Sequence, residues 1–292
     1  MTAQLPSVPS GTGSRFGGSR SAEIRLLGPL TVVDRRGEAL PVAPKPRVVL
    51  ALLASRVQRA VSATAVAEEL WGEEPPKSAQ GTVQTYVAQL RRSLAQATGL
   101  SAEATAERVL VTEGGGYRLA DELLQIDTLR FTALDHAGRS ALRRGCAQEG
   151  RELLSGALTL WRGAPLVNVA CGIRLGALLP RLEEERLAVQ EARLVADLEA
   201  GDHYSVVGEL LELSAQHPLN ESLCGLLMLA LYRGGRRAEA LTVLRDLRDR
   251  LVAELGLEPG DNLLRLQTQI LRGDPALDLP TTGRIPQPRL AS

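Results

Sequence analysis

Two patterns of hydrophobic and polar positions follow one another along the chain, and the change between them predicts two domains. From Glu23, short β-like runs of apolar residues are separated by turns such as Gly28-Pro29. From Asp127 onward, Leu, Ala and Val recur instead at helical spacing. A chain of 292 residues is long enough for two domains that each bury a core of their own.

The first pattern predicts a small antiparallel sheet, three helices and a hairpin. The expected strands cover residues 24–27, 30–34 and 39–42, and the expected helices cover residues 45–59, 62–71 and 78–97. Ser62 is the expected N-cap of the second helix, and a proline-containing loop at residues 72–77 follows it. After another loop at Gly99, residues 108–112 and 117–120 form a hairpin around three glycines. This order of elements is that of a winged helix-turn-helix with an N-terminal sheet.

The second pattern predicts an all-α, tetratricopeptide-like repeat domain, so that the chain as a whole is mainly α. Gly201 and Gly235 lie 34 residues apart, and each ends one expected helix. The apolar positions after these glycines match in pairs: Val206 and Ala240, Val207 and Leu241, Leu210 and Leu244, Leu213 and Leu247. A helix–turn–helix period of this length is typical of tetratricopeptide repeats. The expected helices cover residues 128–144, 147–162, 177–200, 203–217, 219–234, 237–255 and 260–272.

Composition and charge support this division. Residues 1–20 and 277–292 are rich in polar, Pro or Gly residues, so we expect disordered tails around a winged-helix domain at 21–121 and a helical domain at 122–276. Residues 20–120 carry 13 Lys+Arg against 10 Asp+Glu, a net +3, whereas residues 121–276 carry 18 against 23, a net −5. A mildly basic first half suits contact with nucleic acid, although the whole chain has a formal net charge of zero.

The sequence gives no indication of an enzyme, a metal site or a membrane span. Its three cysteines have no CxxC spacing, its three histidines have no metal-ligand spacing, and no phosphate loop, GxSxG or HExxH motif occurs. We therefore expect no catalytic residue and no cofactor, with Cys146, Cys171 and Cys224 as buried free thiols in a reducing compartment. No apolar run approaches the length needed to cross a bilayer, so we expect a soluble cytoplasmic protein.

The third expected helix carries the pattern with the most chemical meaning. A narrow apolar stripe on it is assigned to the core: Val83, Val87, Leu90 and Leu94. The opposite face has no acidic residue and consists of Gly81, Thr85, Ala88, Gln89 and Arg92. Small residues let a helix lie deep in the major groove of DNA, where Gln can pair with adenine, Arg with guanine, and a Thr methyl group can contact thymine. This face therefore has the composition of a recognition helix.

Residues beside this face would complete a DNA contact. Thr82 and Arg91 flank it at positions that reach phosphates. The glycine-rich hairpin at residues 113–117 has the backbone freedom that a wing needs to approach DNA, with Thr112 and Arg118 next to it. The alternatives are a solvated helix that lacks acids by chance, a plain tight turn and a surface charge.

The motifs of both halves resemble those of one family of regulators. Residues 23–120 resemble the OmpR-type winged helix through VAEELWG at 66–72, TVQTYVAQLRRSL at 82–94 and GYRL at 116–119. Residues 127–274 resemble the bacterial transcriptional activation domain through residues 127–131, LWRGAPL at 160–166, RLEEERL at 181–187, HPLNE at 217–221, ALYR at 230–233 and ELGLEP at 254–259. In this colinear order, the chain resembles the Streptomyces antibiotic regulatory protein family, in its small single-module type.

The resemblance implies roles for two sets of residues. Ala88 and Gln89 occupy positions that are often basic and contact DNA in OmpR-type domains, and Glu113 occupies the wing position often held by arginine. With the pattern of the helix and hairpin, the resemblance predicts base reading by Thr85, Gln89 and Arg92. The full set of predicted DNA contacts is Thr82, Thr85, Gln89, Arg91, Arg92, Thr112 and Arg118. The loop after the second helix corresponds to the segment that contacts RNA polymerase in related activators, which implies contacts by Trp71, Glu73, Glu74 and Lys77. A merely solvated loop is the alternative.

The resemblance also implies a function, namely that of a sequence-specific DNA-binding transcriptional activator. We expect a homodimer on double-stranded promoter DNA, bound to direct repeats near the −35 element, in a nucleoid-associated protein with no membrane partner. It would recruit RNA polymerase holoenzyme, including its sigma factor, to promoters of an antibiotic biosynthetic cluster. A repeat-type adaptor and a ligand-responsive regulator remain as alternatives.

In the helical domain we assign four large apolar residues to the core: Trp161, Leu182, Leu187 and Leu257.

Overall fold

The structure, a computed structural model, describes residues 21–278, and these residues pack as two compact units. The first unit comprises the chain up to Arg130 together with Trp161–Pro180, and the second comprises Phe131–Leu160 and the chain from Arg181. Each unit has its own hydrophobic core. The sequence-based boundary near residue 121 assigned Trp161–Pro180 to the helical domain, whereas in the structure this segment packs with the winged helix.

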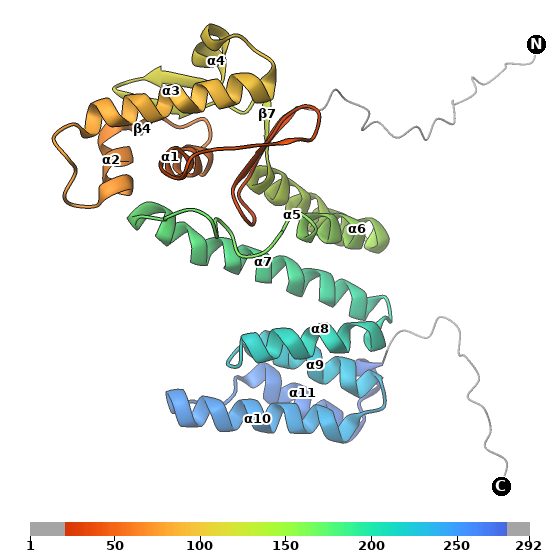
Figure 1. The fold of residues 1–292 in the computed structure, drawn as a ribbon. Coiled ribbons are helices and arrows are strands. Elements are labelled where there is room, and N and C mark those ends of the chain that lie inside the picture. Colours follow the sequence, from red (N-terminus) through yellow and green to blue (C-terminus); the bar gives the residue numbers. More distant parts are fainter. Residues whose placement is uncertain (1–20, 279–292) are drawn as a thin grey trace, which may run out of the picture. The chain divides into compact units, whose positions relative to one another are not determined.

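The first unit contains two small sheets and four helices (Figure 1). In chain order its elements are β1 (Ala22–Arg25), β2 (Thr31–Val33), β3 (Ala39–Leu40), α1 (Pro44–Ala54), β4 (Val61–Ser62), α2 (Ala63–Trp71), α3 (Ala79–Thr98), α4 (Ala102–Arg108), β5 (Leu110–Glu113), β6 (Gly116–Leu119) and β7 (Leu124–Ile126). The two helices α5 (Asp127–Arg143) and α7 (Ile173–Glu199) contribute residues to both units. The mainly helical fold with small N-terminal sheets is the predicted fold class.

One sheet has the strand order β3-β2-β1-β7, and the other has the order β4-β6-β5. The predicted antiparallel strands β1, β2 and β3 are present, and β5 and β6 form the predicted hairpin. Strand β7 pairs in parallel with β1, placing Ile126 opposite Ile24. This pairing was not predicted, because a strand of three residues leaves no clear alternation in the sequence.

The helices of the first unit pack on one another through the predicted apolar positions. Ser62 caps α2 as predicted, since its hydroxyl oxygen accepts a hydrogen bond from the backbone N–H of Ala65 (3.1 Å). Helix α4 lies where a loop was expected. Ser101 caps it by accepting from the N–H of Ala104 (3.1 Å), and Thr105 is its only buried residue, so it lacks the apolar periodicity that predicts a helix.

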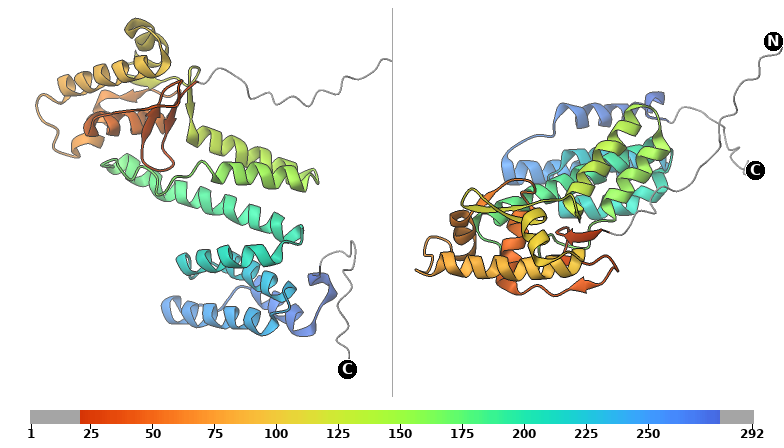
Figure 2. Two further views of the ribbon diagram at one scale, coloured as in Figure 1. Left: turned by 45° about the vertical axis from the view of Figure 1, so that its right-hand side comes forward. Right: turned by 90° about the horizontal axis from the view of Figure 1, so that it is seen from above.

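The second unit is built from the helices that the spacing of apolar residues predicted. After α5, these are α6 (Ala147–Leu158), α7, α8 (His203–Gln216), α9 (Glu221–Arg233), α10 (Arg237–Leu255) and α11 (Asp261–Arg272), followed by a 3-10 turn at Pro275–Leu277. Figure 2 shows α8 to α11 stacked as successive hairpins. No helix within residues 21–278 is long and apolar enough to cross a membrane.

The predicted 34-residue repeat is present in this stack. Gly201 and Gly235 both adopt a positive φ, of 91° and 76°, in the turns before α8 and α10. The paired positions after them have matching burial: Val206 and Ala240, Leu210 and Leu244, Leu213 and Leu247 are buried, and Val207 and Leu241 are half-buried. The repeat therefore places equivalent side chains in one continuous core.

The core assignments from the sequence hold with one exception. Trp161, Leu182 and Leu187 are buried as expected, but Leu257 is 57% exposed, because it follows the C-cap of α10 in the connection to α11. The ordered chain also extends past Ala276, since Leu277 is buried in the second core. The remaining predicted tail residues, 1–20 and 279–292, lie outside the described residues.

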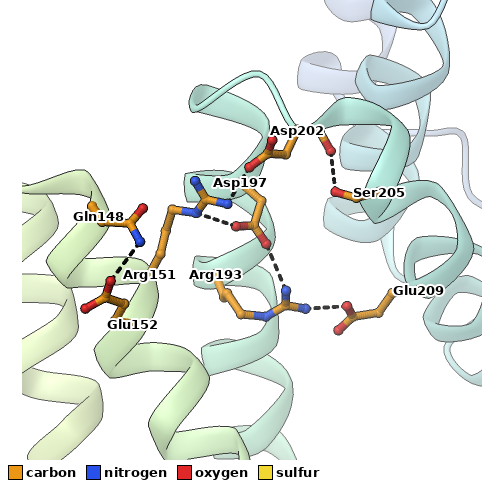
Figure 3. Close-up of polar contacts among 8 residues, drawn as sticks. All are labelled: Gln148, Arg151, Glu152, Arg193, Asp197, Asp202, Ser205 and Glu209. Atoms are coloured by element: carbon orange, nitrogen blue, oxygen red, sulfur yellow. Dashed lines mark hydrogen bonds and ion pairs between the residues drawn. The ribbon is translucent and has the colours of Figure 1, made fainter.

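Asp197 joins three helices of the second unit through a network of ion pairs (Figure 3). Its buried carboxylate accepts hydrogen bonds from Arg151 of α6 (2.7 Å) and Arg193 of α7 (2.8 Å). Arg193 also pairs with Glu209 of α8, and Arg151 pairs with Asp202 at the start of α8. Because one carboxylate is shared by two guanidinium groups, the packing of α6, α7 and α8 depends on its charge.

Replacing Asp197 should therefore destabilise this unit. We expect Asp197→Asn to lower the free energy of unfolding by about 2 kcal/mol, because a neutral amide cannot compensate two partly buried guanidinium groups. Glu152→Gln is the matched control. Glu152 is an exposed carboxylate near the same network, and it accepts a hydrogen bond from the uncharged side chain of Gln148 (2.8 Å). Hydrogen exchange of α6, α7 and α8 measures the difference, and equal protection in the two variants would contradict the assignment.

The three cysteines differ in accessibility. Cys224 is buried, Cys171 is intermediate and Cys146 is exposed, so the expectation of buried thiols is right for Cys224 and wrong for Cys146, which lies at the start of α6. Burial, with a smaller contribution from Glu221, raises the pKa of Cys224 to about 12. Within residues 21–278, no cluster of His, Cys, Asp and Glu is arranged to hold a metal ion.

Thiol labelling should separate these cysteines. With iodoacetamide at pH 8, we expect Cys146 to react in the folded protein and Cys224 to react only after denaturation, because the thiolate is the reactive form. Peptide mass spectrometry of the native and the urea-denatured protein would measure both. Modification of Cys224 in the native protein at the rate of Cys146 would show that its environment is not the one described.

Candidate nucleic-acid interface

Helix α3 separates a buried face from an exposed one. Its predicted core stripe is buried: Val83, Val87, Leu90 and Leu94. Of the opposite face, Gly81, Thr85, Ala88 and Arg92 are exposed and Gln89 is partly exposed. No acidic residue occurs anywhere in the helix. The helix thus presents small and hydrogen-bonding side chains on a surface without negative charge.

The two threonines of this surface donate their hydroxyl protons to the helix itself. Thr82 donates to the carbonyl of Ser78 (3.1 Å), and Thr85 donates to the carbonyl of Gly81 (3.0 Å). Each oxygen is left free to accept, and each methyl group is held in one rotamer. Thr85 is therefore suited to accept from a base amino group or to contact a methyl group.

Gln89 and Arg92 border a shallow hollow of about 300 Å³. Its other wall comes from Pro41, Val42 and Ala43, at the start of α1. Ala43 supplies no side-chain cap to α1, and no acidic residue lies in the first turn of that helix. The hollow beside the predicted base-reading residues therefore has positive and hydrogen-bonding groups but no carboxylate.

Arg91 connects α3 to the hairpin. Its Nε donates to the carbonyl of Leu110 (2.9 Å), and its Nη2 donates to Oγ1 of Thr112 (2.8 Å). Two residues that the sequence predicted as separate DNA contacts are thus bonded to each other. These bonds fix the position of the hairpin against the helix.

The hairpin itself has a glycine turn and a paired arginine. Gly114 and Gly115 have φ of 58° and 75°, a conformation that favours glycine. Arg118 donates to Glu113 (2.7 Å) and to the side-chain oxygen of Gln58 (3.0 Å). Since Glu113 balances its charge, Arg118 gives the hairpin less positive potential than an unpaired arginine would.

The loop after α2 carries exposed charges of both signs. Trp71 packs against the first core and is half-buried, whereas Glu73, Glu74 and Lys77 are exposed. Gly72 ends α2 with a φ of 69°. Trp71 is the last residue of α2, and the other three residues lie in the loop that follows it, with their charged groups accessible.

The segment Trp161–Pro180 is a part of the first unit that the sequence did not indicate. The N–H of Arg162 donates to the carbonyl of Leu27 (2.8 Å), and the N–H of Leu166 donates to the carbonyl of Gly28 (2.7 Å). Asn168 forms two bonds with the backbone of Leu30, accepting from its N–H (2.7 Å) and donating to its carbonyl (3.2 Å). The segment is therefore hydrogen-bonded to the chain between β1 and β2.

Asp127 connects the chain after β1 to Arg162 of the same segment. Its carboxylate is buried and accepts from the N–H groups of Leu26 (2.7 Å) and Leu27 (3.0 Å), and Arg162 lies 3.1 Å from it. Burial raises the pKa of this carboxyl, while the two N–H groups and the arginine oppose that shift. The acid that begins α5 thus serves as a structural anchor.

Glu69 binds the first turn of α7 to α2. It is buried, and its carboxylate accepts from the N–H groups of Gly172 (2.6 Å), Arg174 (2.8 Å) and Leu175 (3.2 Å). A Cβ atom on Gly172 would lie 2.4 Å from the carbonyl oxygen of Glu69, so only glycine fits there. A carboxylate among the buried positions of α2 was the one signal in the sequence for this contact.

Comparison with known proteins identifies both parts of the chain. Residues 37–119 match the family model "Transcriptional regulatory protein, C terminal", and residues 126–271 match "Bacterial transcriptional activator domain". The chain is 43% identical to the regulatory protein DnrI of Streptomyces peucetius over 256 residues, which cover 88% of this chain and 94% of DnrI. The chain belongs to the Streptomyces antibiotic regulatory protein family.

Two further relatives support this membership. The transcriptional regulator RedD of Streptomyces coelicolor is 36% identical to this chain over 269 residues, which cover 91% of this chain and 74% of RedD. A solved structure of Mycobacterium tuberculosis EmbR, in complex with a low-affinity phosphopeptide, superposes on this chain with a TM-score of 0.81 and 32% sequence identity. The match covers 89% of this chain and 66% of the EmbR chain. Members of the family are transcriptional regulators and not enzymes, as the sequence led us to expect.

The two neighbouring arginines of α3 should differ in their effect on the stability of this regulator. Arg91→Ala should lower the free energy of unfolding by about 1–2 kcal/mol, because it removes two hydrogen bonds between α3 and the hairpin. Arg92→Ala should change it by less than about 0.5 kcal/mol, because this side chain is exposed. Both tryptophans, Trp71 and Trp161, lie in the first unit, so urea unfolding followed by their fluorescence reports on this unit. Equal losses in the two variants would argue against a structural role for Arg91.

Proposed function

We propose that this regulator is a sequence-specific DNA-binding activator that places α3 in the major groove. The observation that carries the proposal is the exposed face of α3, which has no acid and combines Gly81 and Ala88 with Thr85, Gln89 and Arg92. Small residues permit close approach to the bases, and the three polar side chains supply complementary hydrogen-bonding groups. Arg92 is the candidate for guanine and Gln89 for adenine.

The flanking residues would hold the protein to the DNA backbone. Thr82 lies one turn before Thr85, Thr112 and Arg118 lie in the two strands of the hairpin, and Arg91 is bonded to Thr112. Contacts of this kind set the register of a protein on DNA without reading sequence. Because Glu113 pairs with Arg118, we assign this hairpin to the phosphates rather than to the minor groove.

The loop after α2 is the proposed contact with RNA polymerase holoenzyme, including its sigma factor. Glu73 and Glu74 are exposed and suit a basic surface, and Trp71 and Lys77 complete the loop. Each 1.4 kcal/mol of contact changes promoter occupancy by about tenfold, so a few such side chains suffice for recruitment. The protein would act as a homodimer on direct repeats near the −35 element, in the cytoplasm at the nucleoid, on promoters of an antibiotic biosynthetic cluster.

Selection from random duplex DNA tests the base-reading proposal. We expect the protein to enrich one short repeated sequence, and Arg92→Ala to lower its affinity for that sequence by roughly tenfold or more while the preference at one guanine is lost. Arg250→Ala is the control, because it removes an equal, exposed charge from α10.

Two outcomes would count against this function. Enrichment of no sequence at moderate salt would favour the alternative of a repeat-type adaptor, and binding that requires an added metabolite would favour a ligand-responsive regulator. If Arg92→Ala kept the sequence preference of the wild type, the proposal that α3 reads the bases through Arg92 would be wrong.

A further inference from the structure

The first unit has an open hollow of about 520 Å³ beside the loop after α2. The end of α2, the loop and the first turn of α7 form its walls. Residues that line it include Ala67, Glu68, Gly72, Glu73, Pro75 and Ile173. Ile173 is 74% exposed, the largest exposure among the large apolar side chains of residues 21–278. The hollow thus joins residues of the winged helix with a residue of the segment Trp161–Pro180.

Ile173 is held in this position by the backbone around it. The residues on either side, Gly172 and Arg174, both donate their N–H groups to the buried carboxylate of Glu69. Because the backbone on both sides of Ile173 is fixed, a partner that covers this side chain need not order the chain around it, and burial of its apolar surface is favourable. An exposed isoleucine on a fixed backbone, at the rim of a hollow, is a suitable anchor for a partner protein.

The charges around the hollow specify the partner further. Glu68 and Glu73 line it, and one exposed residue of each charge, Glu74 and Lys77, follows in the same loop. Arg174 is the basic residue of the lining, and it pairs with Glu68 (2.6 Å). The carboxylate of Glu69 is already occupied by backbone N–H groups. The rim therefore has an excess of negative charge around an apolar centre.

We propose that this hollow receives an apolar side chain flanked by Arg or Lys, from a subunit of RNA polymerase holoenzyme. The proposal rests on the function proposed above and extends the polymerase contact from the loop to α7. The loop supplies the negative charge, and Ile173, from the activation domain, supplies the buried apolar contact. Activation would then depend on both domains at one surface.

The test uses the full chain, its selected DNA sequence and purified RNA polymerase holoenzyme. Ile173→Ser should leave affinity for the DNA unchanged but lower activated transcription in vitro by roughly tenfold, the fold-change that corresponds to about 1.4 kcal/mol of lost contact. Val167→Ser is the matched control, because Val167 is 65% exposed in the same segment and does not line the hollow. It should activate like the wild type.

Each other outcome has one meaning. Wild-type transcription by Ile173→Ser, with activation lost in a Glu73→Lys variant, would overturn this inference and leave the proposed function standing. Failure of the wild type to bind DNA or to activate would instead defeat the proposed function. Loss of DNA affinity or of native tryptophan fluorescence in Ile173→Ser would overturn the inference by assigning Ile173 to the fold. A lower mass of Ile173→Ser than of the wild type in sedimentation would overturn the inference by showing that the hollow binds a second copy of the chain.

Discussion

Two buried carboxylates, Asp127 and Glu69, hold the segment Trp161–Pro180 on the winged helix, and the shape of the first unit depends on them. Asp127 accepts two backbone N–H groups and Glu69 accepts three, and loss of an acceptor at such a buried or partly buried group costs about 1–3 kcal/mol. A neutral side chain of similar size could not satisfy them all. The winged helix is therefore completed by residues that follow it in the sequence and match a different family model.

This interleaving changes how the two matched domains should be understood. The model "Bacterial transcriptional activator domain" begins at residue 126, yet part of its length packs in the first core through Leu166 and Leu175. The helical repeat around α8 to α11 has a separate core, and Asp197 ties α6, α7 and α8 to it. Sequence families and packing units therefore divide this chain at different places.

The sequence predicts those parts of the fold that local pattern determines. Helix α3 and the 34-residue repeat have regular apolar spacing, and Ser62 has the side chain that a helix start requires, so all three could be assigned. Helix α4 and strand β7 are short and have no such pattern.

Long-range contacts set a second limit. The partners of Glu69 lie more than 100 residues away, and nothing in the sequence near α2 names them. For the candidate site, the exposed and buried faces of α3 follow from its spacing. The bond between Arg91 and Thr112 depends on where the hairpin folds, and so it could not be foreseen.

The separation of faces on α3 has a consequence for how such regulators diverge. Val83, Val87, Leu90 and Leu94 are buried and hold the helix, whereas Thr85 and Arg92 are exposed and Gln89 is partly exposed. Under the proposed function, mutations at the second group can alter the set of target genes at almost no cost in stability. A duplicated copy could therefore acquire a new regulon through a few tolerated substitutions, with Arg91 as a position where change would be constrained by the fold.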